Sequence, residues 1–195
     1  MDCPIRRRGF AQALVGGSDS SRCSLISVAV EEREVLPPGL FNNHAFGLVR
    51  RGVLVRERTH PSGARIAIDA AGPGAYVPLA GSVGCTGYAA SRVLLCVYPE
   101  PVYTPEPGEE QLTADLNCLL RETLERVECI IEASRRASAE ERVDAVMETL
   151  TAWLGAGAPE KLLQRDLAAL VGMRVETVCR VLRVRAARRQ PVLHE

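Results

Sequence analysis

The stretch from Leu162 to Leu182 constrains the fold of this 195-residue chain more than any other. Two apolar patterns at helical spacing follow one another there, and Gly172 separates them. The first consists of Leu167, Leu170 and Val171, and the second of Val178, Val181 and Leu182. Two short amphipathic helices joined by a tight glycine-containing turn form a helix-turn-helix, whose second helix enters the DNA major groove. The stretch therefore predicts a DNA-binding element, with an ordinary helical hairpin as the alternative.

Polar side chains on the second predicted helix suit contacts with bases. Glu176 can accept a hydrogen bond from a cytosine amino group. Arg180 lies four residues on, on the same helical face, and can donate two hydrogen bonds to guanine. The basic residues around them can meet backbone phosphates, and these are Lys161, Arg165, Arg174, Arg183, Arg185, Arg188 and Arg189. In a plain helical hairpin the same charges would form a solvated face.

The order of residues in this stretch resembles the DNA-reading element of the CRP/FNR family of bacterial transcription regulators. The matching positions are, in order, Asp166-Leu167-Ala168, Val171-Gly172, Val175-Glu176-Thr177, Arg180 and Leu182. The spacing Glu-Thr-x-x-Arg is the specific part of the match. Val175 stands where the cyclic-AMP-dependent branch has arginine, so the resemblance implies an FNR-like TTGA-type half-site. It also implies a DNA-contacting set made of Arg165, Arg174, Val175, Glu176, Thr177, Cys179, Arg180 and Arg183.

Charge is distributed unevenly along the chain, although the formal net charge is zero. Residues 161–195 carry eight basic against three acidic side chains, whereas residues 106–148 carry twelve acidic against five basic ones. A basic end of this kind suggests contact with a polyanion.

The hydrophobic content of 47% and the charged content of 25% are typical of soluble globular proteins. The chain has no apolar run of the roughly 18 residues that a membrane span needs, and Arg6-Arg7-Arg8 precedes no apolar signal region. We therefore expect a cytoplasmic protein without membrane contact.

Residues 25–98 show short apolar segments separated by glycine and proline. The pattern predicts strands at 26–30, 46–49, 53–58, 65–69, 88–90 and 93–98. It predicts turns at Pro37-Pro38-Gly39, His60-Pro61-Ser62-Gly63 and Gly72-Pro73-Gly74. Short strands at this spacing indicate a small antiparallel barrel or roll. Their order resembles the sensory β-roll of CRP/FNR regulators, a jelly roll of the cyclic-nucleotide-binding type, whereas residues upstream of about Leu25 match no part of it.

A long helix is predicted to begin near Glu109. One stripe of this helix alternates spacings of four and three residues, as the seam of a coiled coil does. The stripe consists of Leu116, Leu120, Thr123, Val127 and Ile130. It favours a two-fold helix pair between protomers over a single core helix, and the resemblance implies that this helix is the dimer axis. A homodimer would present two recognition helices to half-sites about one helical turn apart.

The expected fold is α+β in three parts. These are a β-roll sensor domain (1–108), a dimerisation helix (109–136) and a helix-turn-helix DNA-binding domain (137–195). Ser138 and Glu141 have the spacing of a capping box and mark the start of the helix that opens the third part. The family normally adds a β-hairpin wing after the recognition helix. Only residues 190–195 follow Arg189, so we expect the wing to be shortened or absent.

Cyclic-nucleotide binding is not expected. The binders in this family carry Gly-Glu-Leu followed by Arg-Ser-Ala, which place a carboxylate on the ribose and an arginine on the phosphate. The corresponding stretch here, Gly74-Ala75-Tyr76-Val77-Pro78-Leu79, has no acidic residue and no Arg-Ser-Ala after it. A cyclic phosphate buried without that arginine would remain uncompensated.

Seven cysteines suggest a sensor that uses thiols. Cys96 resembles the cysteine that the β-roll of oxygen-sensing FNR proteins contributes to an iron–sulfur cluster. Cys3 and Cys23 would supply two more thiolates, although the tight N-terminal cysteine cluster of those proteins is missing, and Cys85 or Cys118 could supply the fourth. The alternatives are a thiol–disulfide sensor, haem held by His44, His60 or His194, and cysteines that act as small apolar residues, which we favour for Cys118, Cys129 and Cys179.

No arrangement typical of catalysis is present. The sequence lacks a Ser/His/Asp ordering, a phosphate loop, His-Glu-x-x-His and Cys-x-x-Cys, so we do not expect an enzyme. We expect a homodimeric transcription regulator that binds double-stranded DNA, contacts RNA polymerase and responds to redox state, oxygen or nitric oxide through a [4Fe–4S] cluster. The alternatives are an effector-independent or thiol-redox regulator without a cofactor, a regulator that acts through protein contacts, and a metal-carrying redox protein.

Overall fold

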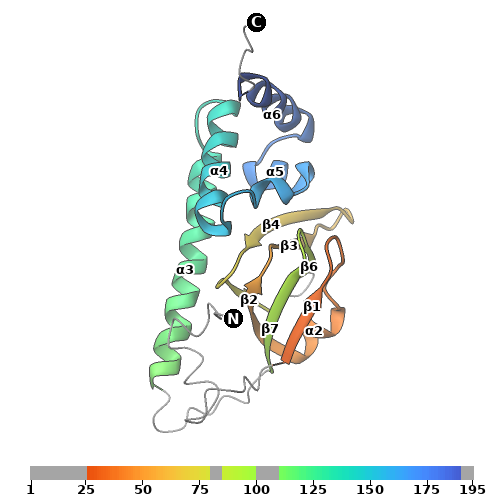
Figure 1. The fold of residues 1–195 in the computed structure, drawn as a ribbon, viewed down its shortest axis with the longest axis vertical. Coiled ribbons are helices and arrows are strands. Elements are labelled where there is room, and N and C mark those ends of the chain that lie inside the picture. The colour runs from red at the N-terminus through yellow and green to blue at the C-terminus, as the bar shows by residue number, and fades with distance from the viewer. Residues whose placement is uncertain (1–25, 80–84, 100–109, 190–195) are drawn as a thin grey trace, which may run out of the picture.

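The computed structural model describes residues 26–79, 85–99 and 110–189. Strands occupy the first half of the chain and helices the second, and the long helix α3 runs beside the strands (Figure 1). The strands are β1 (Ile26–Val30), β2 (His44–Arg51), β3 (Leu54–Thr59), β4 (Arg65–Ala71), β5 (Tyr76–Pro78), β6 (Cys85–Ala89) and β7 (Val93–Pro99). The helices are α2 (Pro38–Asn43), α3 (Glu110–Ser134), α4 (Ala139–Leu154), the 3₁₀ turn η2 (Pro159–Lys161), α5 (Gln164–Val171) and α6 (Val175–Arg189).

The strands form two antiparallel sheets that enclose an apolar core. The strand order is β1-β7-β2-β5 in one sheet and β4-β3-β6 in the other. Successive side chains alternate between the two faces of a strand. Leu95 and Val97 therefore point between the sheets, where they pack with Val49, Leu54 and Val77. The predicted antiparallel roll is confirmed.

A tight turn joins β2 to β3 and depends on Gly52. Gly52 has φ +86°, a conformation that costs other residues strain, and a β carbon there would lie 2.1 Å from the carbonyl oxygen of Arg92. By contrast, Gly63 in the β3–β4 turn has φ +82° but open space where a β carbon would be. Only the first glycine is thus required by packing as well as by conformation.

A second apolar core joins the outer face of the three-stranded sheet to the helices. The sheet contributes Val53, Val55, Ala67, Ala70, Tyr88 and Ala90. The helices contribute, among others, Ile130 and Ala133 of α3, Val143, Val146 and Leu150 of α4, Leu167 and Val171 of α5, and Val178 of α6. The helix-turn-helix is therefore packed into the same core as the sheet.

The predicted capping box at the start of α4 is confirmed. The Ser138 side chain accepts a hydrogen bond from the Glu141 N–H at 3.1 Å, and the Glu141 carboxylate accepts from the Ser138 N–H at 3.0 Å. The hydrogen bonds from Ser138 lower the pKa of the Glu141 carboxyl group. Two backbone donors at the helix start are thereby satisfied.

Two local predictions were incomplete. The segment after Pro37 forms helix α2 and not only a turn, because Pro38 is preorganised for the first helical position and Leu40 is buried against the inter-sheet core. Strand β5 was missed, since three residues between glycine-rich segments give too short a pattern; it pairs with Phe46, Gly47 and Leu48 of β2. The prediction of a shortened or absent wing concerns residues 190–195, which lie outside the described residues. Among the described helices, none is long and apolar enough to cross a membrane.

Candidate nucleic-acid interface

Helices α5 and α6 form the predicted helix-turn-helix. Helix α5 ends at Gly172, whose φ of +70° and ψ of +38° place it in the left-handed region that glycine adopts without strain. The Gly172 N–H bonds to the carbonyl groups of Ala168 and Ala169 and so satisfies the end of the helix. Helix α6 begins at Val175, after three intervening residues, and its Val178 is fully buried in the core that it shares with α5. The left-handed conformation of Gly172 ends α5 and turns the chain toward the start of α6.

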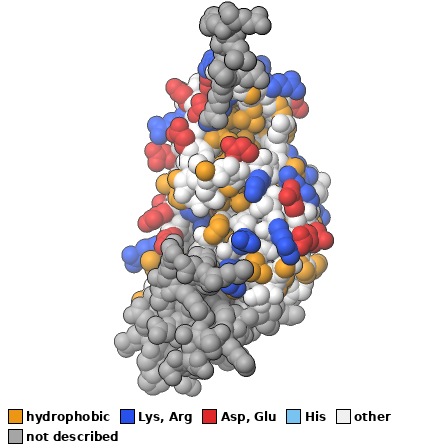
Figure 2. All heavy atoms as spheres, viewed as in Figure 1, with side chains coloured by type: hydrophobic (Ala, Val, Ile, Leu, Met, Phe, Trp, Pro, Cys, Tyr) orange, Lys and Arg blue, Asp and Glu red, His pale blue; other side chains and the backbone are white. Residues whose placement is uncertain are grey.

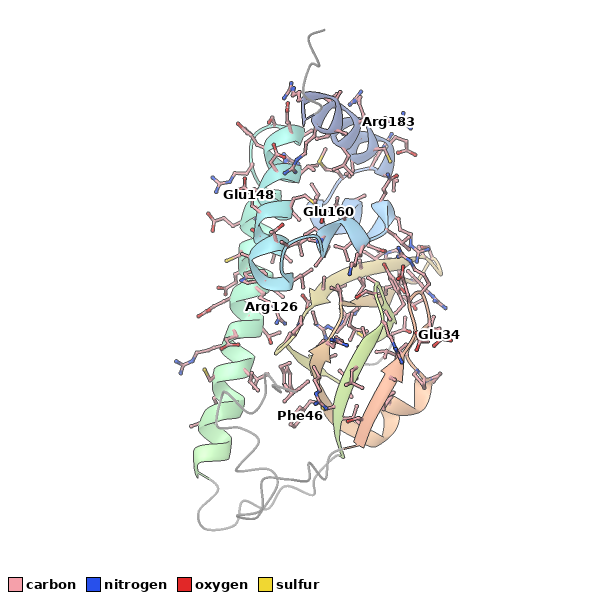
Figure 3. The ribbon with its side chains drawn as sticks, viewed as in Figure 1. Glu34, Phe46, Arg126, Glu148, Glu160 and Arg183 are labelled. Atoms are coloured by element: carbon pink, nitrogen blue, oxygen red, sulfur yellow. The ribbon has the colours of Figure 1, made fainter. Side chains whose placement is uncertain are left out.

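The predicted base-contacting residues lie on the exposed side of α6. Glu176, Arg180 and Arg183 are exposed and share the helix face opposite the buried Val178. Figure 3 shows Arg183 projecting away from the rest of the molecule. At the start of the helix, Arg174 and Val175 are exposed as well, whereas Thr177 and Cys179 are half-buried. The structure thus brings most of the predicted set together on one accessible helix face.

Cys179 has a specific neighbour across the turn. Its thiol donates a hydrogen bond to the side-chain oxygen of Gln164, the first residue of α5, at 2.8 Å. The contact ties the starts of the two helices together next to the exposed face. The half-buried thiol thus makes a polar contact within the helix pair, whereas the interpretation favoured from the sequence was a small apolar packing residue.

Some basic residues of α6 have acidic partners on α4. Arg185 pairs with Asp144 at 2.7 Å, and Arg188 pairs with Glu140. In the part of the chain that the structure describes, Arg174, Arg180 and Arg183 take part in no ion pair. The contact of Arg185 and Arg188 with phosphates stays a prediction, and each arginine would have to leave its carboxylate partner to make it. Acidic and basic side chains are accordingly intermingled over the visible face of the molecule (Figure 2).

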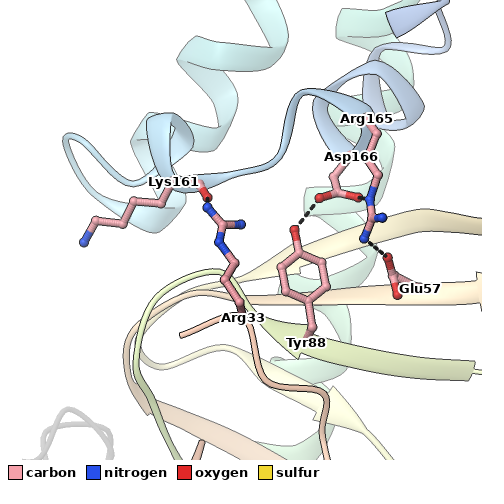
Figure 4. Close-up of polar contacts among 6 residues, drawn as sticks. All are labelled: Arg33, Glu57, Tyr88, Lys161, Arg165 and Asp166. Atoms are coloured by element: carbon pink, nitrogen blue, oxygen red, sulfur yellow. Dashed lines mark hydrogen bonds and ion pairs between the residues drawn. The ribbon is translucent and has the colours of Figure 1, made fainter. Parts of the chain in front are cut away.

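The start of α5 is docked on the three-stranded sheet by polar contacts (Figure 4). The Tyr88 hydroxyl donates to the Asp166 carboxylate, and Arg165 pairs with Glu57 of β3 and with Asp166, each at 3.4 Å. Arg33 donates to the carbonyl oxygen of residue 161 at 3.0 Å. Burial raises the pKa of Glu57, which Arg165 opposes, and burial with the Asp166 contact raises the pKa of Tyr88. Arg165, a predicted DNA-contacting residue, is therefore paired with a carboxylate of the sheet.

A buried charge cluster joins the strands to α3. Asp69 of β4 lies 3.5 Å from Arg56 of β3 and 3.6 Å from Arg126 of α3. Burial raises the pKa of Asp69, although both arginines counteract the effect, and burial lowers the pKa of Arg126. Two cations and one anion thus share a site almost closed to water. This cluster was missed from the sequence, where three charges far apart in the chain give no common signal.

Helix α3 turns an exposed apolar stripe away from the strands. Leu120, Leu124 and Ile131 are 43%, 61% and 43% exposed, and with the half-buried Val127 they follow spacings of four, three and four residues. The predicted seam needs correction at Ile130, which is only 6% exposed and belongs to the protomer's own core.

Two further members of the predicted seam can be placed in part. The half-buried Thr123 hydroxyl donates to the Leu119 carbonyl oxygen within the helix at 2.8 Å. The side chain of Leu116 lies outside the described residues. The exposed stripe therefore shares Leu120 and Val127 with the predicted seam, and has Leu124 and Ile131 in place of Thr123 and Ile130.

The described cysteines do not form a metal site by themselves. Cys96 is buried on β7 and faces away from the inter-sheet core, with the Ser27 hydroxyl 4.0 Å from its sulfur. Cys85 is half-buried on β6, in the other sheet, and Cys118 is exposed on α3. Within the described ranges no three His, Cys, Asp or Glu side chains are grouped to hold a metal ion. Cys3 and Cys23 lie outside these ranges, so the predicted cluster remains a prediction.

The residues at the expected effector position serve packing. Val77 and Leu79 are fully buried, and Val77 belongs to the core between the sheets. The ring of Tyr76 stacks on Phe46 with centroids 5.3 Å apart. Of the histidines considered for haem, His60 sits in the β3–β4 turn and bonds to the Ser62 hydroxyl at 2.9 Å, and the side chains of His44 and His194 lie outside the described residues. The cyclic-nucleotide exclusion and the haem alternative stay predictions.

This arrangement of two antiparallel sheets, a long helix and a helix-turn-helix is the fold of the CRP/FNR transcription regulators. A CRP/FNR-family regulator from Thermus thermophilus matches 84% of this chain and 87% of its own at a TM-score of 0.61 and 22% identity. FixK2 from Bradyrhizobium japonicum matches 84% and 85% at 0.65 and 18%. The c-di-GMP-responsive global regulator CLP from Xanthomonas campestris matches 92% of both chains at 0.62 and 13%. No protein-family model and no curated protein sequence matches the chain. The predicted fold is confirmed.

Proposed function

We propose that this protein is a homodimeric, sequence-specific DNA-binding transcription regulator without enzymatic activity. The observation that carries the proposal is the exposed face of α6, where Glu176, Arg180 and Arg183 project from a helix whose other side is buried. Charged side chains held on one face of a rigid helix suit the major groove. Several solved structures that share the fold are those of transcriptional regulators, which supports the same function.

In the proposed complex, α6 lies in the major groove. Arg180 donates two hydrogen bonds to guanine and Glu176 accepts from a cytosine amino group. Arg174 and Arg183 meet backbone phosphates, which set the position of the helix and contribute salt-sensitive affinity. The resemblance favours a TTGA-type half-site, and it makes RNA polymerase the partner through which bound protein acts.

The exposed stripe of α3 is the proposed dimer interface. Leu120, Leu124, Val127 and Ile131 would pack against the same residues of a second copy, as the core positions of a two-stranded coiled coil do. The strands pack on another side of α3, so a partner helix can approach without displacing them. Pairing of the two long helices would present two α6 helices to one palindromic site.

The test is a binding titration with labelled duplexes at several salt concentrations. We expect salt-sensitive, sequence-selective binding, and Arg180→Ala should remove about 1–3 kcal/mol of discrimination at its guanine. Arg188→Ala is the matched control, because this arginine is on the same helix but is paired with Glu140. Absence of binding at low salt would contradict the proposal, and unchanged sequence preference in Arg180→Ala would contradict the assigned base contact.

The proposed signal is redox state or a gas, sensed through a cysteine-ligated [4Fe–4S] cluster. Cys96 is buried on the face of β7 opposite the inter-sheet core, and it is the position that the resemblance assigns to a cluster ligand. A bound cluster would supply redox chemistry with Cys3, Cys23 and Cys96 as ligands. The alternative is an effector-independent or thiol-redox regulator, in which these cysteines bind no cofactor.

Protein purified without oxygen distinguishes these possibilities. A broad visible absorption that bleaches in air, with matching iron and acid-labile sulfide, would support the cluster, and its loss in Cys96→Ala would assign the ligand. A sharp Soret band would favour haem. A featureless spectrum without iron would favour thiol chemistry or packing.

A further inference from the structure

The first turn of α5 brings a proposed DNA-contacting arginine against buried carboxylates. Glu57 of β3 and Asp166 of α5 are almost fully buried, with side chains 2% and 3% exposed, whereas the Arg165 side chain between them is 59% exposed. Two guanidinium nitrogens of Arg165 are directed at these carboxylates: Nη2 at Glu57 and Nε at Asp166. The arginine therefore has one side on protein and the rest in solvent.

The carboxylates depend on that arginine. Burial raises the pKa of Glu57, Arg165 is the strongest opposing influence, and Asp166 and Arg65 act more weakly in opposite directions. From β6, Tyr88 donates to Asp166, which fixes that carboxylate in place. A buried charge that loses its partner is strongly destabilised. Arg165 is thus held by the sheet. If it moved toward a DNA phosphate, the buried Glu57 carboxylate would lose its partner and the protein would be destabilised.

We propose that Glu57 is an autoinhibitory residue that withholds Arg165 from the DNA backbone. Through the Glu57–Arg165 ion pair, strand β3 limits how strongly the start of α5 can contact a phosphate. This inference rests on the proposed DNA-binding function and adds to it a residue outside the helix-turn-helix that limits affinity.

The position of Glu57 also connects this contact to the dimer helix. The pairing of β3 with β4 shifts register between Arg56 and Glu57, an irregularity that re-aims side chains. The neighbouring Arg56 belongs to the buried cluster with Asp69 and Arg126 of α3. Arg56 is therefore linked to α3 through the shared carboxylate of Asp69, and the next residue on the strand, Glu57, contacts α5. A displacement of α3 that moves Arg56 would therefore also change the position of Glu57 and the strength of its ion pair with Arg165.

The test compares the salt dependence of DNA binding in the full-length protein. Each phosphate contact adds about 0.9 to the slope of log K against log salt. Glu57→Gln keeps the shape of the side chain but removes its charge, so it should bind more tightly at low salt. One added phosphate contact in each protomer of the proposed dimer steepens the slope by about 1.8, so the variant should lose about 12-fold more affinity than wild type between 50 and 200 mM salt. Combined with Arg165→Gln, the same substitution should have no effect on the slope.

A matched control removes the same charge elsewhere on the strand-rich part. Glu31→Gln breaks an exposed ion pair with Arg92 and should leave the slope unchanged. If wild type binds DNA but Glu57→Gln has the wild-type slope, or if Glu31→Gln steepens it equally, the inference is overturned and the proposed function stands. If wild type binds no duplex at low salt, the proposed function fails and the inference fails with it.

Discussion

Truncation of Ile131 measures how much the exposed stripe of α3 contributes to dimerisation. Full burial of an isoleucine side chain contributes about 1.5–3 kcal/mol. Since Ile131 is 43% exposed, covering it in both protomers would contribute roughly 1.3–2.6 kcal/mol per dimer. Alanine keeps the β carbon, so Ile131→Ala should cost about 1–2 kcal/mol, which corresponds to a dimer dissociation constant about 5- to 30-fold higher.

Sedimentation equilibrium over a range of concentrations provides the dissociation constants. The matched control is Ile66→Ala, because Ile66 is 41% exposed on β4, away from α3. It should leave the dissociation constant unchanged. Equal constants for wild type and Ile131→Ala would refute the assigned stripe, and a wild-type protein that stays monomeric throughout would refute the coiled-coil pairing as a whole.

Three further predictions concern stability and are measured by urea denaturation. Ser138→Ala removes the capping box of α4 and should lower the free energy of unfolding by about 0.5–2 kcal/mol. Burial raises the pKa of Asp69, so the native state holds this proton more tightly than the unfolded state; stability should fall as pH rises from the ordinary carboxyl range toward the raised pKa, and Asp69→Asn should flatten this slope. Gly63→Ala should cost about 1–3 kcal/mol for its positive φ. Gly52→Ala should cost more, because its β carbon would also meet the Arg92 carbonyl oxygen; equal losses would refute the clash.

The parts of the fold that the sequence predicted well depend on local interactions. The capping box at Ser138 and the left-handed turn at Gly172 involve residues a few positions apart, so spacing alone identified them. On α3, Leu120 and Val127 of the predicted seam lie in the exposed stripe, but Ile130 is buried and Ile131 is exposed in its place. A helical period tells which residues share a face but not which face meets the strands, and Ile130 and Ile131 are equally apolar.

The candidate interface was predicted in composition but not in charge pairing. The basic excess at the end of the chain suggested a polyanion partner, and the exposed Arg180 and Arg183 fit this expectation. The pairing of Arg188 with Glu140 could not be predicted, because Glu140 lies 48 residues upstream and is brought near by the packing of α4 against α6. Likewise, no local pattern indicated that Arg165 would meet Glu57 on a strand. Long-range ion pairs require the tertiary structure.

The core shared by the sheet and the helix-turn-helix has a consequence for how the protein can be divided. A recombinant fragment that begins at α4 would lose Val55 and Ala70 of the sheet, which belong to the same buried apolar cluster as Leu150, Leu167 and Val171. Such a fragment should aggregate or fold only loosely, and transplanting these helices onto a foreign sensor would require the receiving sheet to offer the same apolar surface. The chain should accordingly melt in one cooperative transition, with the helices that meet DNA no easier to unfold than the strands beneath them.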